Sequence, residues 1–503
     1  MNHNEQTNSF WRASSQQSSF QKLSSDIKVD VAIVGGGISG ITTAYLLAKE
    51  GLCVALLEAD KIINGTTGHT TAKISAQHNV IYHELLEHIG EDKAKLYYNA
   101  NHDALQFIKN MIDEYNIHCD FSQEHSYLYS TTEQSAKLLE QEYKAYERLS
   151  ISGELSETLP VSIPVTLALI MKNQAQFHPV HYLQHLVDLF TKAGGSIYEH
   201  TVAIDVHEGI HPRVITKDGP IVTCDYVISC SHFPFYDGKG LYFTRMYAER
   251  SYVLAVKTKQ PFPGGMYLSV DEPVRSLRYT MDNGEKLVLV GGESHKTGQG
   301  IDTVLHYEAL QSFADEVLGV ETIEYRWSAQ DLLTLDKLPY IGNITSEHPN
   351  ILVATGYKKW GMTTGTAAAL LIRDIIMERS NPYRNLFTPS RFLADPSIKH
   401  FLTQNGDVAK HLIEGKLEFP LRTPEELINE EGSVVRVNGK RAGAYKDCNG
   451  VLHLVDTTCT HLGCEVEWND GESTWDCPCH GSRFSFNGDV LEGPAKKPLD
   501  RLT

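Results

Sequence analysis

Four side chains near the C-terminal end of the chain have the types and the spacing of a metal-cluster site. Cys459 and His461 flank one residue, and Cys477 and His480 flank two residues in a second short segment. Two thiolates and two imidazoles can hold a [2Fe–2S] cluster with one pair on each iron, at a higher reduction potential than four cysteines give. The same ligands also suit a tetrahedral zinc ion, although zinc gives no role to the additional cysteine in each segment.

The region around these residues resembles the Rieske family of [2Fe–2S] domains, in the form that carries an extra cysteine pair. The resemblance covers about residues 426–503, including the strand pattern 433–437 and the turn-rich tail 488–494. It implies a disulfide between Cys464 and Cys479. The cluster ligands that it implies are Cys459 and Cys477 on one iron and His461 and His480 on the other.

Two further positions bear on the potential of the expected cluster. Ser482 matches the family serine whose hydroxyl donates to a bridging sulfide. The respiratory and photosynthetic members place a tyrosine two residues later, where this chain has Phe484. Hydrogen bonds to the cluster sulfurs favour the reduced form, so we expect a potential below that of these members.

A second motif lies near the N-terminus and predicts a dinucleotide site. The apolar run 29–34 is followed by G-x-G-x-x-G (Gly35, Gly37, Gly40), then by an amphipathic helix pattern over 41–50. A second apolar run ends in Glu58, about twenty positions after the glycines, where an acidic residue can bind a ribose hydroxyl. We expect Gly35 to allow the turn, Gly37 to admit the pyrophosphate at the helix N-terminus, and Gly40 to let helix pack on strand.

The fingerprint alone leaves FAD and NAD open, but residues 30 to about 378 resemble the FAD-dependent amino acid and amine oxidase family. The matching segments follow the family order: 65–71, 194–202, 225–230, 336–342 and 351–357. The resemblance implies FAD, and no second G-x-G-x-x-G follows a strand to suggest a nicotinamide domain. The residues expected to contact FAD are Gly35, Gly37, Gly40, Glu58, Thr66, Thr67, His69, Val202, Gly342, Gly361, Met362 and Thr363.

His69 carries two alternatives. Gly65–His69 is similar to a segment of the dimethylglycine-type dehydrogenases of this family, whose histidine is bonded covalently to the flavin. The other interpretation is a hydrogen bond from His69 to the flavin or its pyrophosphate. Acid precipitation distinguishes them, since only a covalently bound flavin stays with the precipitate.

The substrate side is less clearly marked. An arginine often binds the substrate carboxylate in this family, and Arg278 lies where some members carry it. The alternative interpretation, to which we give the same weight, is an ordinary sheet-edge arginine in a surface ion pair. Some sarcosine oxidases use a lysine in the closing loop, where this chain has Thr363, with Lys358 and Lys359 displaced from that position. The sequence names no general base.

The composition limits the class of protein. Acidic residues outnumber basic ones, 63 to 45, which argues against a nucleic-acid or anionic-membrane surface. No apolar stretch is long enough for a transmembrane helix, and residues 1–28 are rich in Ser and Gln without the apolar core of a signal peptide. We therefore expect a cytoplasmic protein with a flexible N-terminal tail.

The expected fold is an α/β FAD-binding domain of the doubly wound, Rossmann-like type with an inserted mixed α+β substrate domain, followed by a small all-β Rieske domain. The tail is 1–28, the oxidoreductase 29–380, the linker 381–423 and the Rieske domain 424–503. Within the oxidoreductase, the flavin part is 29–90, 174–240 and 326–380, and the substrate part is 91–173 and 241–325.

These features predict an enzyme that oxidises an amine or amino acid with FAD and releases electrons singly through the cluster to an unknown one-electron partner. Two alternatives remain at this stage: the cluster reduces the flavin to drive a reductive reaction, or the chain is a non-enzymatic redox sensor or carrier. A ring-hydroxylating oxygenase would need a mononuclear iron site, which the sequence does not offer.

Overall fold

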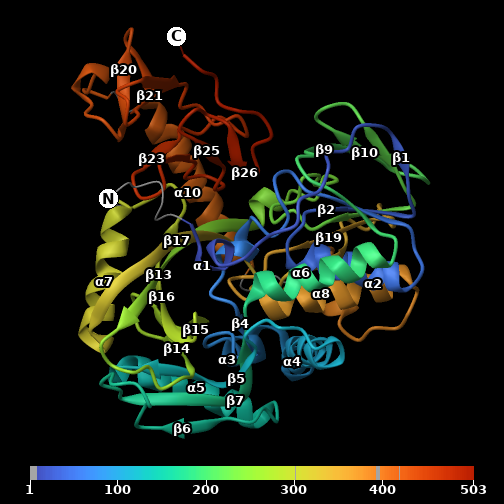
Figure 1. Ribbon diagram of the computed structural model, residues 1–503, viewed down its shortest axis with the longest axis vertical. Coiled ribbons are helices and arrows are strands. Elements are labelled where there is room, and N and C mark those ends of the chain that lie inside the picture. The colour runs from blue at the N-terminus through green and yellow to red at the C-terminus, as the bar shows by residue number, and fades with distance from the viewer. Residues whose placement is uncertain (1–7, 301, 392–396, 418–419, 503) are drawn as a thin grey trace.

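The computed structural model describes residues 8–300, 302–391, 397–417 and 420–502. Figure 1 shows two large sheets side by side, with the C-terminal segment on top of them in orange and red. Both predicted modules are present: an α/β part with a mixed sheet beside it, and a C-terminal part built of small β-sheets.

The first large sheet has six strands, and it presents the dinucleotide loop. Its central strands are buried along their whole length, which explains why they read as continuous apolar runs rather than alternating ones. All neighbours pair in parallel except the edge strand β18. In spatial order the strands are β18 (Tyr340–Asn343), β19 (Ile351–Thr355), β12 (Tyr226–Ser229), β2 (Val31–Val34), β3 (Val54–Leu57) and β8 (Ser196–Tyr198).

The two faces of this sheet are covered differently. A four-stranded sheet shares a hydrophobic core with one face; its strands are β1 (Ile27–Lys28), β11 (Ile221–Thr223), β10 (Arg213–Thr216) and β9 (Ala203–His207). Helices pack together over the other face: α2 (Ile38–Lys49), α4 (Glu91–Tyr115), α6 (Pro179–Lys192) and α8 (Gly361–Ile376).

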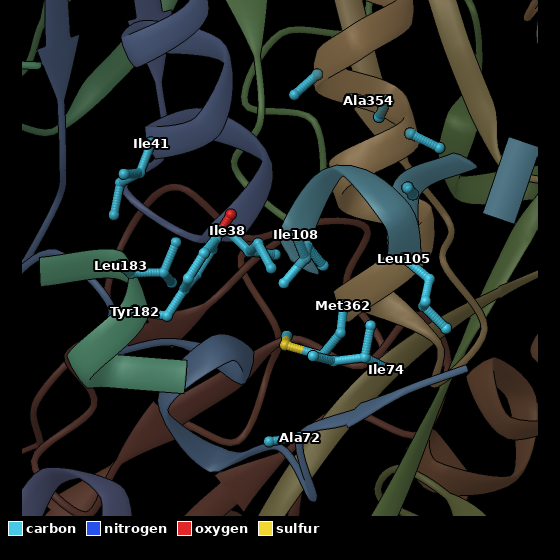
Figure 2. Close-up of a cluster of buried hydrophobic side chains, with 14 of the residues drawn as sticks. Ile38, Ile41, Ala72, Ile74, Leu105, Ile108, Tyr182, Leu183, Ala354 and Met362 are labelled. Atoms are coloured by element: carbon cyan, nitrogen blue, oxygen red, sulfur yellow. The ribbon is translucent and has the colours of Figure 1, made fainter. Parts of the chain in front are cut away.

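The core beneath these helices supports the start of α2 and α8. Figure 2 shows Ile38 of α2, Ile108 of α4 and Met362 of α8 pointing toward one another, with Ile74 of β4 beside Met362. Ile38 and Met362 are each less than 5% exposed, and both also border the large cavity described below. Close packing at this point fixes the two helix N-termini that face the cavity.

The second large sheet is a mixed, nine-stranded one. Its strands are β17 (Val320–Thr334), β13 (Met246–Thr258), β16 (Glu285–Lys296), β15 (Arg275–Asp282), β14 (Met266–Ser269), β5 (Ser122–Ser130), β7 (Leu167–Gln176) and β4 (Lys73–Ile74), with β6 (Glu154–Ser156) beside β7. Helix α7 (Val304–Leu318) shares a buried core with β13 and β16, and α3 (Tyr82–Ile89) and α5 (Glu133–Arg148) lie near β5 and β7. Most of the predicted substrate part is therefore built on this sheet, with α5 and α7 packed against it, whereas α4, also predicted to belong to that part, packs on α8 over the first sheet.

The C-terminal part has two small antiparallel sheets. One contains β20 (Glu431–Val437), β21 (Lys440–Lys446) and β22 (Leu452–Val455). The other contains β23 (Glu467–Asn469), β24 (Thr474–Asp476), β25 (Arg483–Ser485) and β26 (Val490–Glu492). The predicted linker carries α9 (Arg384–Phe387) and α10 (Ser397–Leu417), while residues 392–396 and 418–419 of it lie outside the described residues.

The prediction of a flexible N-terminal tail is wrong for residues 8–28. Helix α1 (Phe10–Ala13) buries Phe10 and Trp11, and Leu23 is 4% exposed. Strand β1 then pairs in parallel with β11. The average composition hid these three large apolar side chains among serines and glutamines, and their burial holds the segment in place. Residues 1–7 lie outside the described residues.

Candidate functional site

The glycine motif adopts the geometry that a dinucleotide loop requires. Gly35 has a φ of +110°, and a Cβ there would lie 2.3 Å from the carbonyl oxygen of Cys230. A Cβ on Gly40 would lie 1.9 Å from the carbonyl oxygen of Gly35, so only glycine lets α2 approach β2 this closely. Gly37 precedes α2 and faces the hydroxyl of Thr67, which accepts a hydrogen bond from the backbone N–H of Ile38.

Glu58 stands at the end of β3 beside this loop. Its carboxylate accepts hydrogen bonds from the backbone N–H groups of Gly36, at 2.7 Å, and of Asp60, at 3.0 Å. Burial raises the pKa of the carboxyl, and these backbone donors oppose that rise. Glu58 borders the cavity, so its position fits the predicted contact with a ribose hydroxyl.

Residues 65–72, called the flavin loop here, are held by side chains from distant parts of the chain. The carbonyls of five consecutive residues, Gly68 to Ala72, each accept a hydrogen bond from a side chain. In order, the donors are Ser9, Trp327, Trp11, and Arg278 for the last two. Fixing every carbonyl removes the backbone freedom that a loop normally keeps, and so orients the side chains that face the cavity.

His69 is one of those side chains. Its Nδ1 lies 3.0 Å from the carbonyl oxygen of Gly65, and the ring borders the cavity. If Nδ1 carries the proton for this bond, Nε2 is left as an acceptor or nucleophile. Burial lowers the pKa of the imidazole, which favours the neutral form that either alternative for His69 uses.

The cavity has a volume of about 1040 Å³, at the upper end of cofactor and substrate sites. Nine of the predicted FAD contacts border it: Gly35, Gly37, Glu58, Thr66, Thr67, His69, Val202, Gly361 and Met362. The N-terminus of α8 opens toward it with no side-chain cap, leaving backbone N–H groups for a ligand. The described residues therefore fit an FAD molecule along most of the predicted path.

Three predicted contacts do not border the cavity. Gly40 packs against Gly35, as its expected structural role requires. Thr363 is 1% exposed, and its hydroxyl lies within hydrogen-bond distance of the Ser75 carbonyl and of His78. Gly342 lies in the edge strand β18, where its nearest neighbours are Pro389 and Ile375. Gly342 was predicted from the family match of segment 336–342, but it packs on the side of β18 away from the cavity lining.

Arg278 does not take the position predicted for it. It is 1% exposed, does not border the cavity, and donates to the carbonyls of Thr71, Ala72 and Tyr279. Those carbonyls use the donors that a substrate carboxylate would need, so the geometry argues against the carboxylate-binding role. The alternative of a surface ion pair is also wrong, because the side chain is buried.

Several charged groups in the cavity were not predicted. Glu84 pairs with Lys337, and Glu249 pairs with Lys359 at 3.0 Å. Lys358 also borders the cavity, and burial together with nearby Lys337 lowers the pKa of its ammonium to about 7. Lys358 and Lys359 stand just before Gly361 in sequence, which was a usable signal, whereas the acidic partners come from distant elements.

The expected cluster ligands converge in the C-terminal part. The thiol of Cys477 faces the sulfur of Cys459 as a donor, and the rings of His461 and His480 lie 5.0 Å apart, centre to centre. Backbone N–H groups at 461–462 and 479–480 point at the two sulfurs, and the Ser482 hydroxyl faces Cys459. The hydrogen bond from Cys477 is the main reason that the pKa of the Cys459 thiol falls to about 7. This donor set fits a cluster with two thiolates and two imidazoles.

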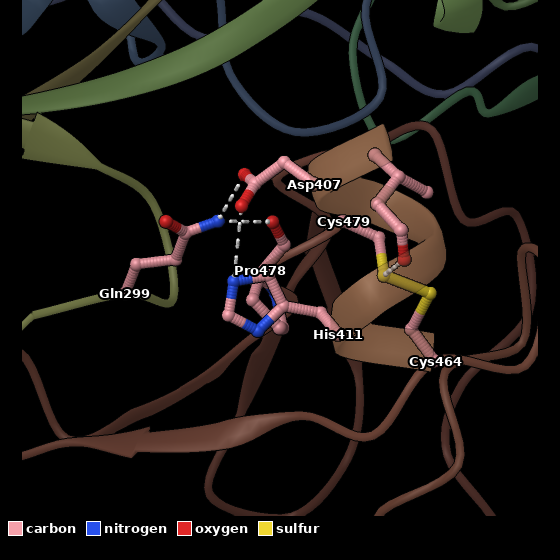
Figure 3. Close-up of a disulfide and its surroundings, with 7 residues drawn as sticks. Gln299, Asp407, His411, Cys464, Pro478 and Cys479 are labelled. Carbon is pink, nitrogen blue, oxygen red and sulfur yellow. Dashed lines mark hydrogen bonds and ion pairs between the residues drawn. A yellow bond between two sulfur atoms is a disulfide. The ribbon is translucent and has the colours of Figure 1, made fainter. Parts of the chain in front are cut away.

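The remaining two cysteines of these segments are joined to each other. Cys464 and Cys479 form a disulfide that links the cluster loops, defined here as residues 459–464 and 477–482. Figure 3 shows the disulfide beside α10, where the Cys479 sulfur lies 3.8 Å from the carbonyl oxygen of Val408. The sulfurs of Cys464, Cys477 and Cys479 lie within 4.8 Å of one another, so only Cys477 of these three remains for a metal.

The two cluster histidines face the oxidoreductase part. The ring of Phe243, just before β13, lies nearly perpendicular to both imidazoles, and its centre is 5.4 Å from the centre of each. The tail 489–498 of the C-terminal part also borders the same cavity as the flavin loop. Both the oxidoreductase part and the C-terminal part therefore border the cavity.

An ionic group links the two parts; it is called the interface quartet here and consists of Arg250, Asp476, Arg483 and Glu492, of which Glu492 alone is partly exposed. Arg250 of β13 is 1% exposed and lies 3.8 Å from the carboxylates of both Asp476 and Glu492. Arg483 pairs with the same two carboxylates, at 3.2 and 3.5 Å. Burial alone would raise the pKa of the Asp476 carboxyl, but Arg483 and Arg250 outweigh it and lower that pKa.

Comparison with known proteins agrees with both halves of this geometry. Residues 30–375 match the family model of FAD dependent oxidoreductases, and residues 418–503 match that of Rieske [2Fe-2S] domains. A Bacillus subtilis protein described as a Rieske 2Fe-2S iron-sulfur protein, YhfW, is 52% identical over 98% of this chain and 97% of its own length. Gamma-glutamylputrescine oxidoreductase of Escherichia coli is 25% identical over 76% of this chain and 92% of its own.

Solved structures share the fold of the oxidoreductase part. Glycine oxidase from Geobacillus kaustophilus aligns with a TM-score of 0.62 at 19% identity, covering 73% of this chain and 100% of its own. L-Proline dehydrogenase from P. horikoshii aligns with a TM-score of 0.61 at 18% identity, covering 73% and 98%. Among the described residues, no helix has the length and apolar character needed to cross a membrane.

The ligand assignment predicts that His461→Ser or His480→Ser abolishes the spectrum of the reduced cluster while the protein keeps its bound flavin. The imidazoles are the only donors assigned to one iron, so serine cannot replace them. Electron paramagnetic resonance checks this, with His453→Ser as the matched control, since His453 pairs with Asp447 outside the cluster loops. An unchanged cluster signal in either ligand variant would show that the ligand set is different.

The fixed flavin loop predicts that Trp11→Phe destabilises the flavin site. The change removes the indole donor to the Thr70 carbonyl, at 2.7 Å, and keeps an aromatic ring in the core. One lost hydrogen bond costs about 1 kcal/mol, which should lower the temperature of flavin release by about 2 °C. Flavin fluorescence during heating measures this. Trp468→Phe, which loses a bond to Asp470 instead, should leave the release temperature unchanged.

The missing tyrosine predicts that Phe484→Tyr raises the reduction potential of the cluster. Phe484 is fully buried in the core that contains Cys459 and Cys477, so an added hydroxyl can donate to a cluster sulfur. A bond of about 1 kcal/mol corresponds to a rise of about 40 mV for one electron. Phe486→Tyr is the control, because Phe486 packs on Tyr445 and His453 instead. Equal potentials in all three proteins would contradict the prediction.

Proposed function

Because the chain belongs to the FAD-dependent oxidoreductase family and ends in a Rieske [2Fe–2S] domain, we propose that it oxidises an amine or an amino acid and passes the electrons out singly through the cluster. It is an oxidoreductase whose cofactors are FAD and a [2Fe–2S] cluster. The observation that carries the proposal is the shared cavity, bordered by both the flavin loop and the tail of the Rieske domain.

The residues divide the work within this cavity. The glycine loop and Glu58 hold the adenosine and pyrophosphate half of FAD, and the N-terminus of α8 faces the other half. FAD supplies a two-electron acceptor when it is bound. The flavin loop, with every carbonyl from Gly68 to Ala72 bonded, keeps the acceptor in a constant position.

Oxidation of one substrate molecule releases two electrons, so the cluster would have to carry one electron twice. Oxidation of a carbon–nitrogen bond to an imine removes two electrons and two protons, and water then hydrolyses the imine to a carbonyl compound and an amine. A [2Fe–2S] cluster accepts one electron at a time, so two equivalents of an external one-electron acceptor are consumed. The cluster in this role makes the enzyme a dehydrogenase rather than an oxidase.

A nitrogen-containing substrate is supported by the relatives and by the cavity wall. Relatives and fold neighbours carry the names gamma-glutamylputrescine oxidoreductase, glycine oxidase and L-proline dehydrogenase. The wall beside the flavin site carries two ion pairs, Glu84 with Lys337 and Glu249 with Lys359, and the ammonium of Lys358, so it offers both signs of charge to a substrate. These groups suit a small charged substrate, and both an amine and an amino acid meet that description.

The proposal predicts the order of events in an anaerobic titration with amines and amino acids. The correct substrate should bleach the flavin absorbance first, and the signal of the reduced cluster should follow. Absorbance and electron paramagnetic resonance measure the two steps. In the His461→Ser control the bleaching should persist without any cluster signal.

Two results would contradict the proposal. Reduction of the cluster by an external donor, followed by flavin reduction that no amine can produce, would mean that electrons flow inward. Failure of every amine and amino acid to bleach the flavin, with both cofactors bound, would remove the enzymatic assignment to this substrate class.

A further inference from the structure

Gln330 bonds to both redox sites at once. It lies in β17 and is 2% exposed. Its side-chain Nε2 donates to the carbonyl of Gly481 at 2.9 Å, and its backbone carbonyl accepts from the Thr66 hydroxyl at 3.0 Å. Thr66 belongs to the flavin loop, and Gly481 directly follows the cluster ligand His480. Two hydrogen bonds and one residue therefore connect the two loops.

The amide of Gln330 is held in this orientation. Its Oε1 accepts a hydrogen bond from the Thr297 hydroxyl at 2.7 Å, which leaves Nε2 directed at the cluster loop. Thr297 is itself 2% exposed, so neither group can exchange its partner for water. This assignment also fixes which end of the amide is oxygen and which is nitrogen, because Gly481 offers only an acceptor.

The cluster loop meets β13 and β17 with no free space at Gly481. Gly481 has a φ of +76°, and a Cβ there would lie 2.3 Å from the Cβ of Ala248 and 3.3 Å from the amide nitrogen of Gln330. The contact is therefore a close fit of backbone to sheet, formed where the loop turns between His480 and Ser482. A change in the Gln330 side chain must therefore shift the backbone of this turn.

Other residues that contact the cluster loops do not also bond to the flavin loop. The amide of Gln299 donates to the Pro478 carbonyl at 3.2 Å, but its second partner is Asp407 of α10. Phe243 touches both imidazoles through ring contacts. Among the residues that the structure describes, Gln330 is the one with hydrogen bonds to both the flavin loop and a cluster loop.

The geometry points to Gln330 as the positioning residue that couples the flavin to the cluster, so that electron transfer between them depends on its side-chain amide. This inference rests on the proposed function. Electronic coupling declines more slowly through covalent and hydrogen bonds than across a gap, and the Thr66–Gln330–Gly481 connection is continuous. With both cofactors bound, each passage would take one electron from the reduced flavin to the oxidised cluster without breaking a bond, and the protons that the flavin gives up would pass to solvent.

The test compares Gln330→Leu with Gln299→Leu in the full-length protein with both cofactors. A light pulse delivers an electron to the bound flavin under anaerobic conditions, and the absorbance of the cluster reports its arrival. Gln330→Leu should slow this transfer about tenfold or more, since small displacements of positioned groups have effects of this size. Gln299→Leu should stay close to wild type. Both reduction potentials should be unchanged in both variants.

A second measurement does not depend on the flavin. Hydrogen–deuterium exchange of the segment 477–483 should increase in Gln330→Leu, in protein with and without FAD, because the turn at Gly481 loses its partner. If Gln330→Leu does not fold, Thr297→Val replaces it; this variant removes only the hydroxyl that orients the amide and should slow the transfer less. A wild-type transfer rate in either folded variant would overturn the inference.

The outcomes separate this inference from the proposed function. Equal slowing in Gln330→Leu and Gln299→Leu would mean that both residues merely hold the domains together, and it would refute the specific role of Gln330. If the wild-type protein passes no electron from flavin to cluster, the proposed function fails instead. Normal wild-type transfer with selective slowing in Gln330→Leu supports both.

Discussion

The buried guanidinium of Arg250 is the interaction on which the arrangement of the two redox modules depends. It comes from the substrate sheet, and both carboxylates that face it, Asp476 and Glu492, belong to the Rieske domain. Loss of both carboxylates would leave the buried guanidinium without a counter-ion, which costs about 3–5 kcal/mol, whereas Asp476 and Glu492 are also paired with Arg483 inside their own domain. The Rieske domain therefore has one strongly preferred position against the substrate sheet, even though Arg250 lies more than two hundred residues before Asp476 and Glu492 in the sequence.

Once the domain is seated, the other features act together. Its tail closes one side of the cavity that the glycine loop and the flavin loop border, and Phe243 covers the face of the cluster histidines. The N-terminal segment fixes the flavin loop from the opposite side through Ser9 and Trp11. The contacts of Arg250 fix the Rieske domain against the oxidoreductase part, and a mobile carrier domain would not need such buried contacts.

The sequence predicted the features whose chemistry depends on the spacing of residues within one short segment. The glycine loop and the four expected cluster ligands are short segments whose local turns impose the geometry, so reading them required no knowledge of the rest of the fold. Arg278, Trp11 and Gln330 were beyond that reading, since their partners lie far away along the chain. For Arg278 the sequence predicted a carboxylate-binding role, but backbone carbonyls take its donors, and only the packed structure shows which acceptors lie within reach.

We expect the flavin and the cluster to be held at one fixed separation inside a single protein. Pulsed electron paramagnetic resonance on half-reduced protein measures the dipolar coupling between the two centres directly. We predict one narrow distance distribution that does not change with ionic strength, because Arg250, Asp476 and Arg483 of the interface quartet are buried and salt screens their interactions little. A broad distribution, or one that shifts to longer distances as salt is added, would contradict a fixed seat for the Rieske domain.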